Sequence, residues 1–201
     1  MSGARTARAW TFRGLVLVGM GWLLYSWFLP WWSMDIAQLG PDRVIVRPWG
    51  EEANLGAWQM VFDMPQLPAF FEPFAWTYLG VCVVLLILSL LVKDKIIKLG
   101  RFTASLPQAI VGAVGIAYIA VPAIATLAIM INLSMFEVDG VTVPLQGTVH
   151  LDFGQPWASD VTSRLRLGYW LAWGAGAFLI LMALMRDKIV GKGHGEHSSN
   201  Q

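Results

Sequence analysis

The chain has 201 residues, of which 56% are hydrophobic and only 13% are charged, and its formal net charge is +1. Soluble domains carry about 25% charged residues, so this composition indicates an integral membrane protein. The charge balance gives no reason to expect nucleic-acid binding. The single cysteine, Cys82, excludes an intrachain disulfide and a cysteine-based metal cluster.

Four apolar runs are long enough to cross a bilayer as helices, which takes roughly 17–25 residues. They cover residues 14–31, 74–92, 106–133 and 167–185. The first run follows a basic N-terminal arm, as in a signal peptide, but no small-residue cleavage site comes after it, so we predict a retained helix. Pro122 lies in the middle of the overlong third run, where it predicts a kink.

Basic residues predict the orientation of these helices. Ten of the 14 lysines and arginines lie before the first run, between the second and third, or after the fourth. Basic loops stay in the cytoplasm, so we expect both termini on the cytoplasmic side of the plasma membrane. Ten of the 13 acidic residues lie in the two other loops, which gives the outer side a net negative charge.

Two outer loops, residues 32–73 and 134–166, are long enough to fold. Three segments in them predict β structure, because they alternate, are β-branched, or place Asp-Gly between apolar residues. These segments are the strand 43–47, the hairpin centred on Asp139-Gly140 and the strand 148–153. We expect strands of the two loops to pair, with Trp49 or Trp58 beneath them.

These elements predict an all-α membrane protein, a bundle of four transmembrane helices with a small extracytoplasmic antiparallel β element. Residues 1–190 form this membrane domain, and both outer loops belong to it. Residues 191–201 are polar and contain Gly and Ser, which predicts a disordered cytoplasmic tail.

Small residues recur at every fourth position in the third and fourth runs. They are Ala109, Ala113 and Ala117, and Gly168, Ala172 and Gly176. This spacing predicts smooth helix faces that another backbone can approach closely. The contacts would lie within the bundle, or would be made with a helix of another subunit.

Asp, Glu, Lys, Arg and His are absent from the four apolar runs. Ion-coupled transporters and proton relays usually place such residues there, so a carrier or channel is the least favoured class. His150 and Asp152 would share one face of a strand and are weak candidates for a metal site, whose third ligand would be Glu137 or Asp139. We expect a structural role for both, and no catalytic residue, cofactor or metal.

Tryptophans gather where the predicted helices meet the outer loops. Six of them are Trp27, Trp31, Trp32, Trp76, Trp157 and Trp170. Because Trp is enriched at membrane–water interfaces, we predict an interfacial belt. The alternative is a contact surface for a partner, a lipid or a quinone-like molecule.

The first outer loop contains Gly56-Ala57-Trp58 after an early tryptophan, Trp31 or Trp32. The layout resembles the claudin-like tetraspan proteins, whose first loop pairs an early Trp with Gly-Leu-Trp and two cysteines. Both cysteines are missing here. The resemblance implies four helices, cytoplasmic ends and a sheet shared by the outer loops, and it implies no activity.

Three functions remain open. The favoured one is a non-catalytic structural or accessory subunit of a larger integral membrane complex, in contact with the bilayer and with other membrane subunits. The second is a membrane subunit of an oxidoreductase or monooxygenase that contributes to a cofactor or substrate site. The third is a small carrier or channel.

Overall fold

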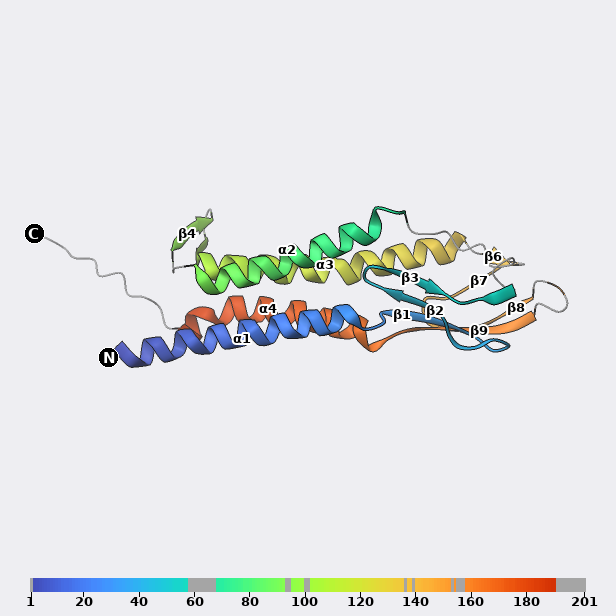
Figure 1. Ribbon diagram of the computed structural model, residues 1–201, viewed down its shortest axis with the longest axis horizontal. Helices are drawn as coiled ribbons and strands as arrows, with labels where there is room; N and C mark the ends of the chain where they lie inside the picture. Colours follow the sequence, from blue (N-terminus) through green and yellow to red (C-terminus); the bar gives the residue numbers. More distant parts are fainter. Residues whose placement is uncertain are drawn as a thin grey trace, which may run out of the picture.

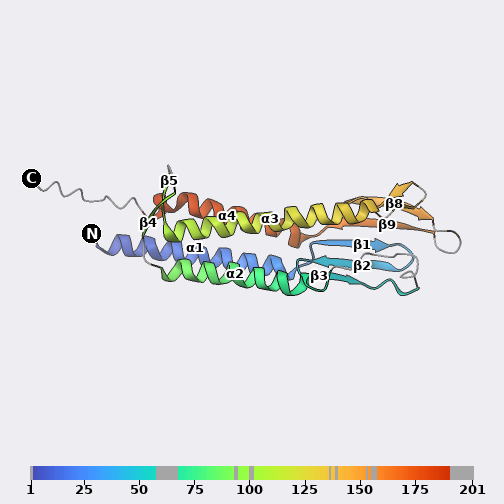
Figure 2. The same cartoon turned by 90° about the horizontal axis from the view of Figure 1, so that it is seen from above.

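The computed structural model describes residues 2–57, 68–92, 95–99, 102–135, 137–138, 140–152, 154 and 158–190. A bundle of helices forms one half of an elongated molecule, and a β-sheet extends from it along the same axis (Figures 1 and 2). The helices are α1 (Ser2–Phe28), α2 (Phe71–Leu91), α3 (Leu106–Met135) and α4 (Leu167–Val190). The start of α1 and the end of α4 lie at the end of the bundle away from the sheet (Figure 1).

The sheet has five antiparallel strands in the order β3-β2-β1-β9-β8. Its strands are β1 (Trp32–Ile36), β2 (Gly40–Arg47), β3 (Gly50–Ala53), β8 (Gly147–Asp152) and β9 (Ala158–Leu165). The prediction of an all-α protein is therefore wrong, because the β element is a full layer built from both outer loops. Two hairpins add β4 (Ile96–Leu99) with β5 (Phe102–Ser105), and β6 (Glu137–Val138) with β7 (Val141–Thr142).

Pairing between the two outer loops is confirmed. It runs through β1 and β9, with Trp32 opposite Leu165 and Ile36 opposite Val161. The predicted strands at 43–47 and 148–153 correspond to β2 and β8, and the hairpin after α3 is β6–β7. Trp49 does not lie beneath the sheet, because its ring packs against Phe28 and Trp76 instead. Trp58 lies outside the described residues.

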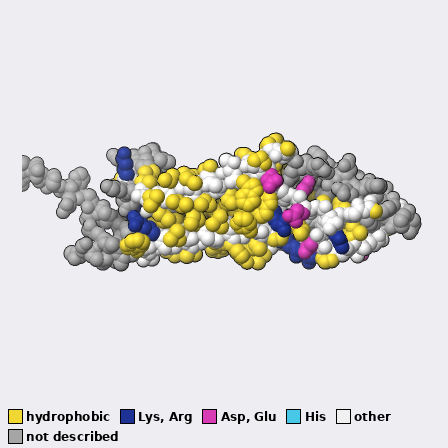
Figure 3. Space-filling model, in the orientation of Figure 1, with side chains coloured by type: hydrophobic (Ala, Val, Ile, Leu, Met, Phe, Trp, Pro, Cys, Tyr) yellow, Lys and Arg dark blue, Asp and Glu magenta, His cyan; other side chains and the backbone are white. Residues whose placement is uncertain are grey.

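Three helices, α2, α3 and α4, are long and apolar enough to cross a membrane. Hydrophobic side chains cover the bundle, and charged side chains gather at its two ends (Figure 3). The remaining predicted span, residues 14–31, lies mostly in α1. Helix α1 is not among the three, since it is less apolar on average than the others. It nevertheless runs beside α4 along the bundle (Figures 1 and 2).

The start of α3 is fixed by a capping box. The hydroxyl of Ser105 accepts a hydrogen bond from the backbone N–H of Gln108 at 3.4 Å, and the side-chain oxygen Oε1 of Gln108 accepts one from the backbone N–H of Ser105 at 3.3 Å. This reciprocal pair satisfies two N–H groups that a helix start leaves without partners. The helix therefore begins at Leu106, where the apolar run begins.

Helices α3 and α4 meet through glycines. A Cβ atom added to Gly176 would lie 2.5 Å from Cγ1 of Ile119 and 3.0 Å from the carbonyl oxygen of Gly115. A Cβ atom on Gly115 would in turn lie 3.0 Å from the carbonyl oxygen of Gly176. The two backbones are thus in direct contact, which is how helices associate where no hydrophobic effect drives them together.

Two consecutive tryptophans join the bundle to the sheet. Trp31 is buried in the helical core, and its indole N–H donates to the carbonyl of Ser26 at 2.9 Å. Trp32 is buried in the core of the sheet, and its indole N–H donates to the carbonyl of Leu145 at 2.8 Å. Because both indoles are buried and hydrogen-bonded, the junction between the two halves is fixed on both sides.

Candidate functional site

A cavity of about 270 Å³ lies between α2, α3, the end of α1 and the adjoining strands β2 and β3. It forms because α2 and α3 separate as they approach the sheet (Figures 1 and 2). The cavity is thus at the level where the apolar bundle gives way to the polar sheet.

Small side chains on α3 and aromatic side chains opposite them make the walls apolar. Alanines recur along the α3 wall, at Ala117, Ala120, Ala125 and Ala128. The opposite wall comes from α2 and the end of α1, with Phe71, Phe74, Tyr78, Trp27 and Trp31. Short alanine side chains leave room beside flat rings, so the space suits a ring or a hydrocarbon chain.

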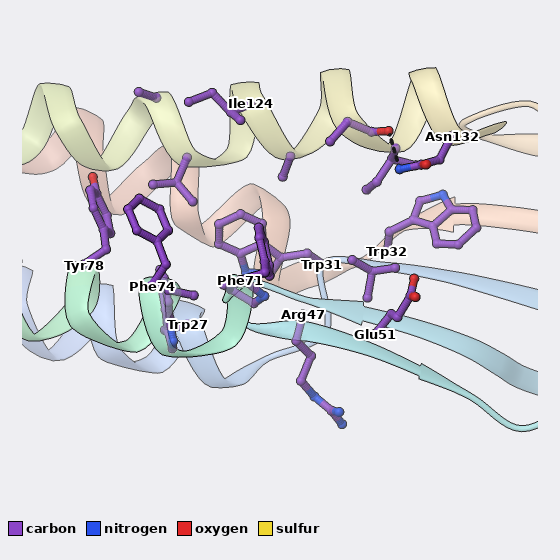
Figure 4. A pocket seen from close by; sticks show the side chains of 18 of the residues that line it. Trp27, Trp31, Trp32, Arg47, Glu51, Phe71, Phe74, Tyr78, Ile124 and Asn132 are labelled. Carbon is purple, nitrogen blue, oxygen red and sulfur yellow. Dashed lines mark hydrogen bonds between the residues drawn. The ribbon is translucent and has the colours of Figure 1, made fainter. Parts of the chain in front are cut away.

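Polar side chains stand at the end of the cavity next to the sheet. Glu51 points from β3 towards α3, on which Asn132 lies, whereas Arg47 points away from the cavity (Figure 4). The side-chain NH₂ group of Asn132 donates to the backbone carbonyl of Ala128 at 2.9 Å. The side-chain oxygen of Asn132 takes no part in this bond. The site therefore has an apolar body and a polar mouth.

Two polar groups of the wall have no oxygen or nitrogen partner in the described structure. They are the indole N–H of Trp27, whose side chain is 1% exposed, and the hydroxyl of Tyr78. The thiol of Cys82 neighbours the Tyr78 hydroxyl, but a thiol is a weak hydrogen-bonding group. Neither atom has surface exposed to the open space of the cavity, so neither hydrogen-bonds to a ligand in this arrangement. A buried polar group without a partner costs about 1–3 kcal/mol.

A hydrogen-bonded pair lies behind this wall. The hydroxyls of Ser26 and Tyr118 are 2.9 Å apart, and Tyr118 also lies 3.1 Å from the carbonyl of Leu23. The Tyr118 ring packs against Trp27 with centroids 6.3 Å apart. These contacts tie α1 to α3 and fix the floor of the cavity.

The predicted metal candidates lie elsewhere, on the sheet. His150 Nδ1 is 2.7 Å from a carboxylate oxygen of Asp160, its partner across β8 and β9, and both side chains are exposed. Asp152 instead accepts the backbone N–H of Gly154 at 2.8 Å. Among the described residues, no three potential metal ligands come together. The side chains of Glu137 and Asp139 lie outside the description.

The two predicted small-residue faces have different surroundings. On α4, Gly168, Ala172 and Gly176 are buried inside the molecule, and a Cβ on Gly168 would lie 2.6 Å from the carbonyl oxygen of Pro30. On α3, Ala113 is exposed and Ala109 is half-buried, whereas Ala117 lines the cavity. The α3 face is therefore a cavity wall and a surface, and α3 meets α4 through Gly115.

The predicted aromatic belt is divided. Trp76 and Trp170 have exposed side chains, as a lipid-facing belt requires, but Trp27, Trp31 and Trp32 are each 1% exposed. These three fill the core and the cavity wall and so do not face lipid, and the interfacial position of the six tryptophans stays a prediction. Trp157 lies outside the described residues.

Several cavity residues were not singled out by their sequence. Glu51, Phe71, Phe74 and Tyr78 carry no motif, and the alanines of α3 indicated packing rather than a cavity. A signal was present in the pattern of α3, where alanines continue beyond Ala117 to Ala128 along the helix.

No protein-family model matches the chain, and no curated protein sequence matches it significantly.

Proposed function

We propose that this chain is a non-catalytic membrane protein that binds an amphiphilic molecule from the bilayer in the cavity between α2 and α3. The observation that carries the proposal is the cavity itself, with an apolar body and a polar mouth. Phe71 lies near the mouth, and Tyr78 is two turns further along α2, roughly 10 Å deeper at about 1.5 Å per residue. This depth accommodates a head and the first part of a tail, while the rest of the tail stays in the lipid.

A pair of matched substitutions on α3 tests the proposal. Ala117→Phe places a ring in the cavity, whereas Ala113→Phe places the same ring one turn away on an exposed position. Lipids extracted from the expression membranes are added to the unaltered protein. When the component that binds reaches 100 times its Kd, the Tm is expected to rise by about 5–10 °C. Ala113→Phe should keep this shift and Ala117→Phe should lose it. Equal shifts in both variants would place the binding outside the cavity.

We propose that the sheet lies on the outer side of the membrane and that the N-terminus and the C-terminus of the chain lie in the cytoplasm. The distribution of lysine and arginine supports this orientation. Because α1 runs beside α4, we propose that it crosses the membrane with it as a fourth span, although it is less apolar.

Single cysteines in a Cys82→Ala background test this orientation. Asp160 on the sheet and Lys95 in the turn after α2 are both exposed. In intact cells, Asp160→Cys is expected to react with an impermeant maleimide, and Lys95→Cys to react only after the cells are opened. Labelling of Lys95→Cys in intact cells would reverse the proposed orientation.

A second proposed function is that of an accessory subunit of a larger membrane complex. The bound amphiphile would then be used by that complex. The sheet supports it, since the described strands β3 and β8 each have one unpaired edge, and such edges can pair with another chain. The claudin-like layout supports it by analogy alone. If the partner is an oxidoreductase or monooxygenase, the cavity is the place for its substrate. Co-purification in mild detergent separates a subunit from a protein that acts alone.

A further inference from the structure

We infer that the cavity selects amphiphiles with an uncharged, oxygen-bearing head and rejects those with an anionic phosphate head. This inference rests on the proposed function and names the class of ligand. It follows from where the positive charges of the outer half of the protein lie and what they are bound to.

Four arginines are the only lysine or arginine residues in the two outer loops, residues 32–73 and 134–166. They are Arg43, Arg47, Arg164 and Arg166. The structure describes all four. A phosphate head bound in the cavity would have to be met by one of them or by a helix N-terminus.

Three of these arginines are held in ion pairs on the sheet. Arg47 pairs with Glu52 on the neighbouring strand. Arg164 pairs with Asp35, and Arg166 pairs with Asp42 and donates to the hydroxyl of Ser33 at 2.8 Å.

These pairs lie on the face of the sheet turned away from its core. Ser33 and Asp35 alternate along β1 with the core residues Trp32, Met34 and Ile36. The Arg47 side chain likewise points away from the cavity (Figure 4).

The fourth arginine is too far along its strand. Arg43 donates to the carbonyl of Leu39 near the β1–β2 turn. It is four residues from Arg47 on β2, which corresponds to roughly 13 Å at about 3.3 Å per residue. Arg47 is therefore the one arginine among the described residues that line the cavity, and its guanidinium points away from the cavity and is paired with Glu52 (Figure 4).

The N-terminus of α2 cannot replace a basic side chain there. The N–H of Phe71 donates to the carbonyl of Pro68 at 2.8 Å, and the N–H of Phe74 donates to Phe70 at 3.1 Å. Pro73 has no N–H. The N–H of Glu72 is left, and the carboxylate of the same residue would repel an anion beside it.

Negative charge is present at the mouth instead. Glu51 points towards the cavity from β3, opposite Val46 on β2. A phosphate at the mouth would be brought close to this carboxylate in a medium of reduced dielectric constant, which is unfavourable. At the same end of the cavity, Asn132 on α3 provides a side-chain amide, which hydrogen-bonds to uncharged oxygen groups. An uncharged carbonyl or hydroxyl head on an apolar tail suits this combination of an amide and a carboxylate, as in prenylquinones, prenols and diacylglycerols.

The test compares two head types in one membrane. The protein is reconstituted into two series of phosphatidylcholine nanodiscs. One series contains equal amounts of phosphatidylglycerol and diacylglycerol, and the other contains equal amounts of phosphatidylglycerol and a prenylquinone. The protein is then transferred to mild detergent. Lipids retained per protein are quantified by mass spectrometry. We expect the uncharged amphiphile to be enriched over phosphatidylglycerol by about tenfold, the scale of one like-charge contact at the edge of the protein. The two nanodisc series show which uncharged class is preferred.

Two variants with the same change in net charge provide the control. Glu51→Arg should bring the enrichment ratio close to one, because it places a cation at the mouth. Asp160→Arg, at an exposed position of β9 that does not line the cavity, should leave the ratio unchanged. Equal or greater retention of phosphatidylglycerol by the unaltered protein, lost in Ala117→Phe, would overturn the inference and leave the proposed function standing. Retention of neither class, or retention unaffected by Ala117→Phe, would refute both.

Discussion

Gly176→Leu is expected to lower the Tm of the detergent-solubilised protein by about 6–12 °C or to prevent its accumulation. A side chain at this position meets Cγ1 of Ile119 and the backbone of Gly115. Overpacking costs about 1–3 kcal/mol in cores that can adjust, and a backbone contact places this site at or above the upper end. For a chain of this size, each kcal/mol corresponds to about 2–4 °C in Tm.

Gly80→Leu is the matched control for Gly176→Leu. Gly80 lies in the middle of α2, and an added Cβ would meet no atom within 4 Å. The variant should retain the Tm of the unaltered protein within about 2 °C, because surface substitutions usually change stability by less than about 0.5 kcal/mol. Equal losses in the two variants would show that α3 and α4 do not depend on their glycine contact.

Trp32→Ala is expected to unfold the sheet while the helices persist. The Trp32 side chain is 1% exposed in the core of the sheet, and its N–H donates to the carbonyl of Leu145. Truncating a buried Trp costs about 3–5 kcal/mol, a large share of the stability of a small layer. Hydrogen exchange should show amides of β1 and β9 losing protection, and those of α3 and α4 keeping it.

Trp170→Ala removes the same side chain from an exposed position at the start of α4. Its effect on exchange in the sheet should be negligible. If Trp32→Ala leaves β1 and β9 protected, or if both variants deprotect them alike, then Trp32 does not hold the core of the sheet.

Helices could be predicted from the sequence more closely than the other parts of this fold. The apolar runs gave the first residues of α3 and α4, Leu106 and Leu167, without error. Helix ends extend beyond the runs, as at α4, which continues past Met185 through the charged residues 186–188 to Val190. Hydropathy measures what a bilayer accepts, and a helix continues in water for as long as its backbone hydrogen bonds do.

Strands at the centre of the sheet were harder to predict. β1 alternates Trp32, Met34 and Ile36 with polar residues, but the Pro-Trp-Trp start of this segment indicated a membrane interface. β9 buries Ser159 and Ser163 on the core side, where hydrophobic residues were expected. The hydroxyl of Ser163 donates to the backbone carbonyl of Pro144. This tertiary hydrogen bond allows a polar side chain to be buried there.

The cavity was not predictable from local pattern. Ala117 belongs to a stripe that equally favours helix contact, and the difference lies in α2, which diverges from α3 towards the sheet. The outer end of α2 is in contact with Trp49, whose ring centroid lies 5.1 Å from that of Trp76. Such long-range contacts leave no periodic signal in the chain.

The most direct test of a bound amphiphile is native mass spectrometry of the unaltered protein, released from mild detergent. The account predicts a species heavier than the 22.2 kDa chain by the mass of one uncharged amphiphile. This species should persist at collision energies that strip loosely attached lipid, and it should be missing from Ala117→Phe and present in Ala113→Phe. A folded protein that appears only as the bare chain, or with the same adducts in both variants, would contradict binding in the cavity between α2 and α3.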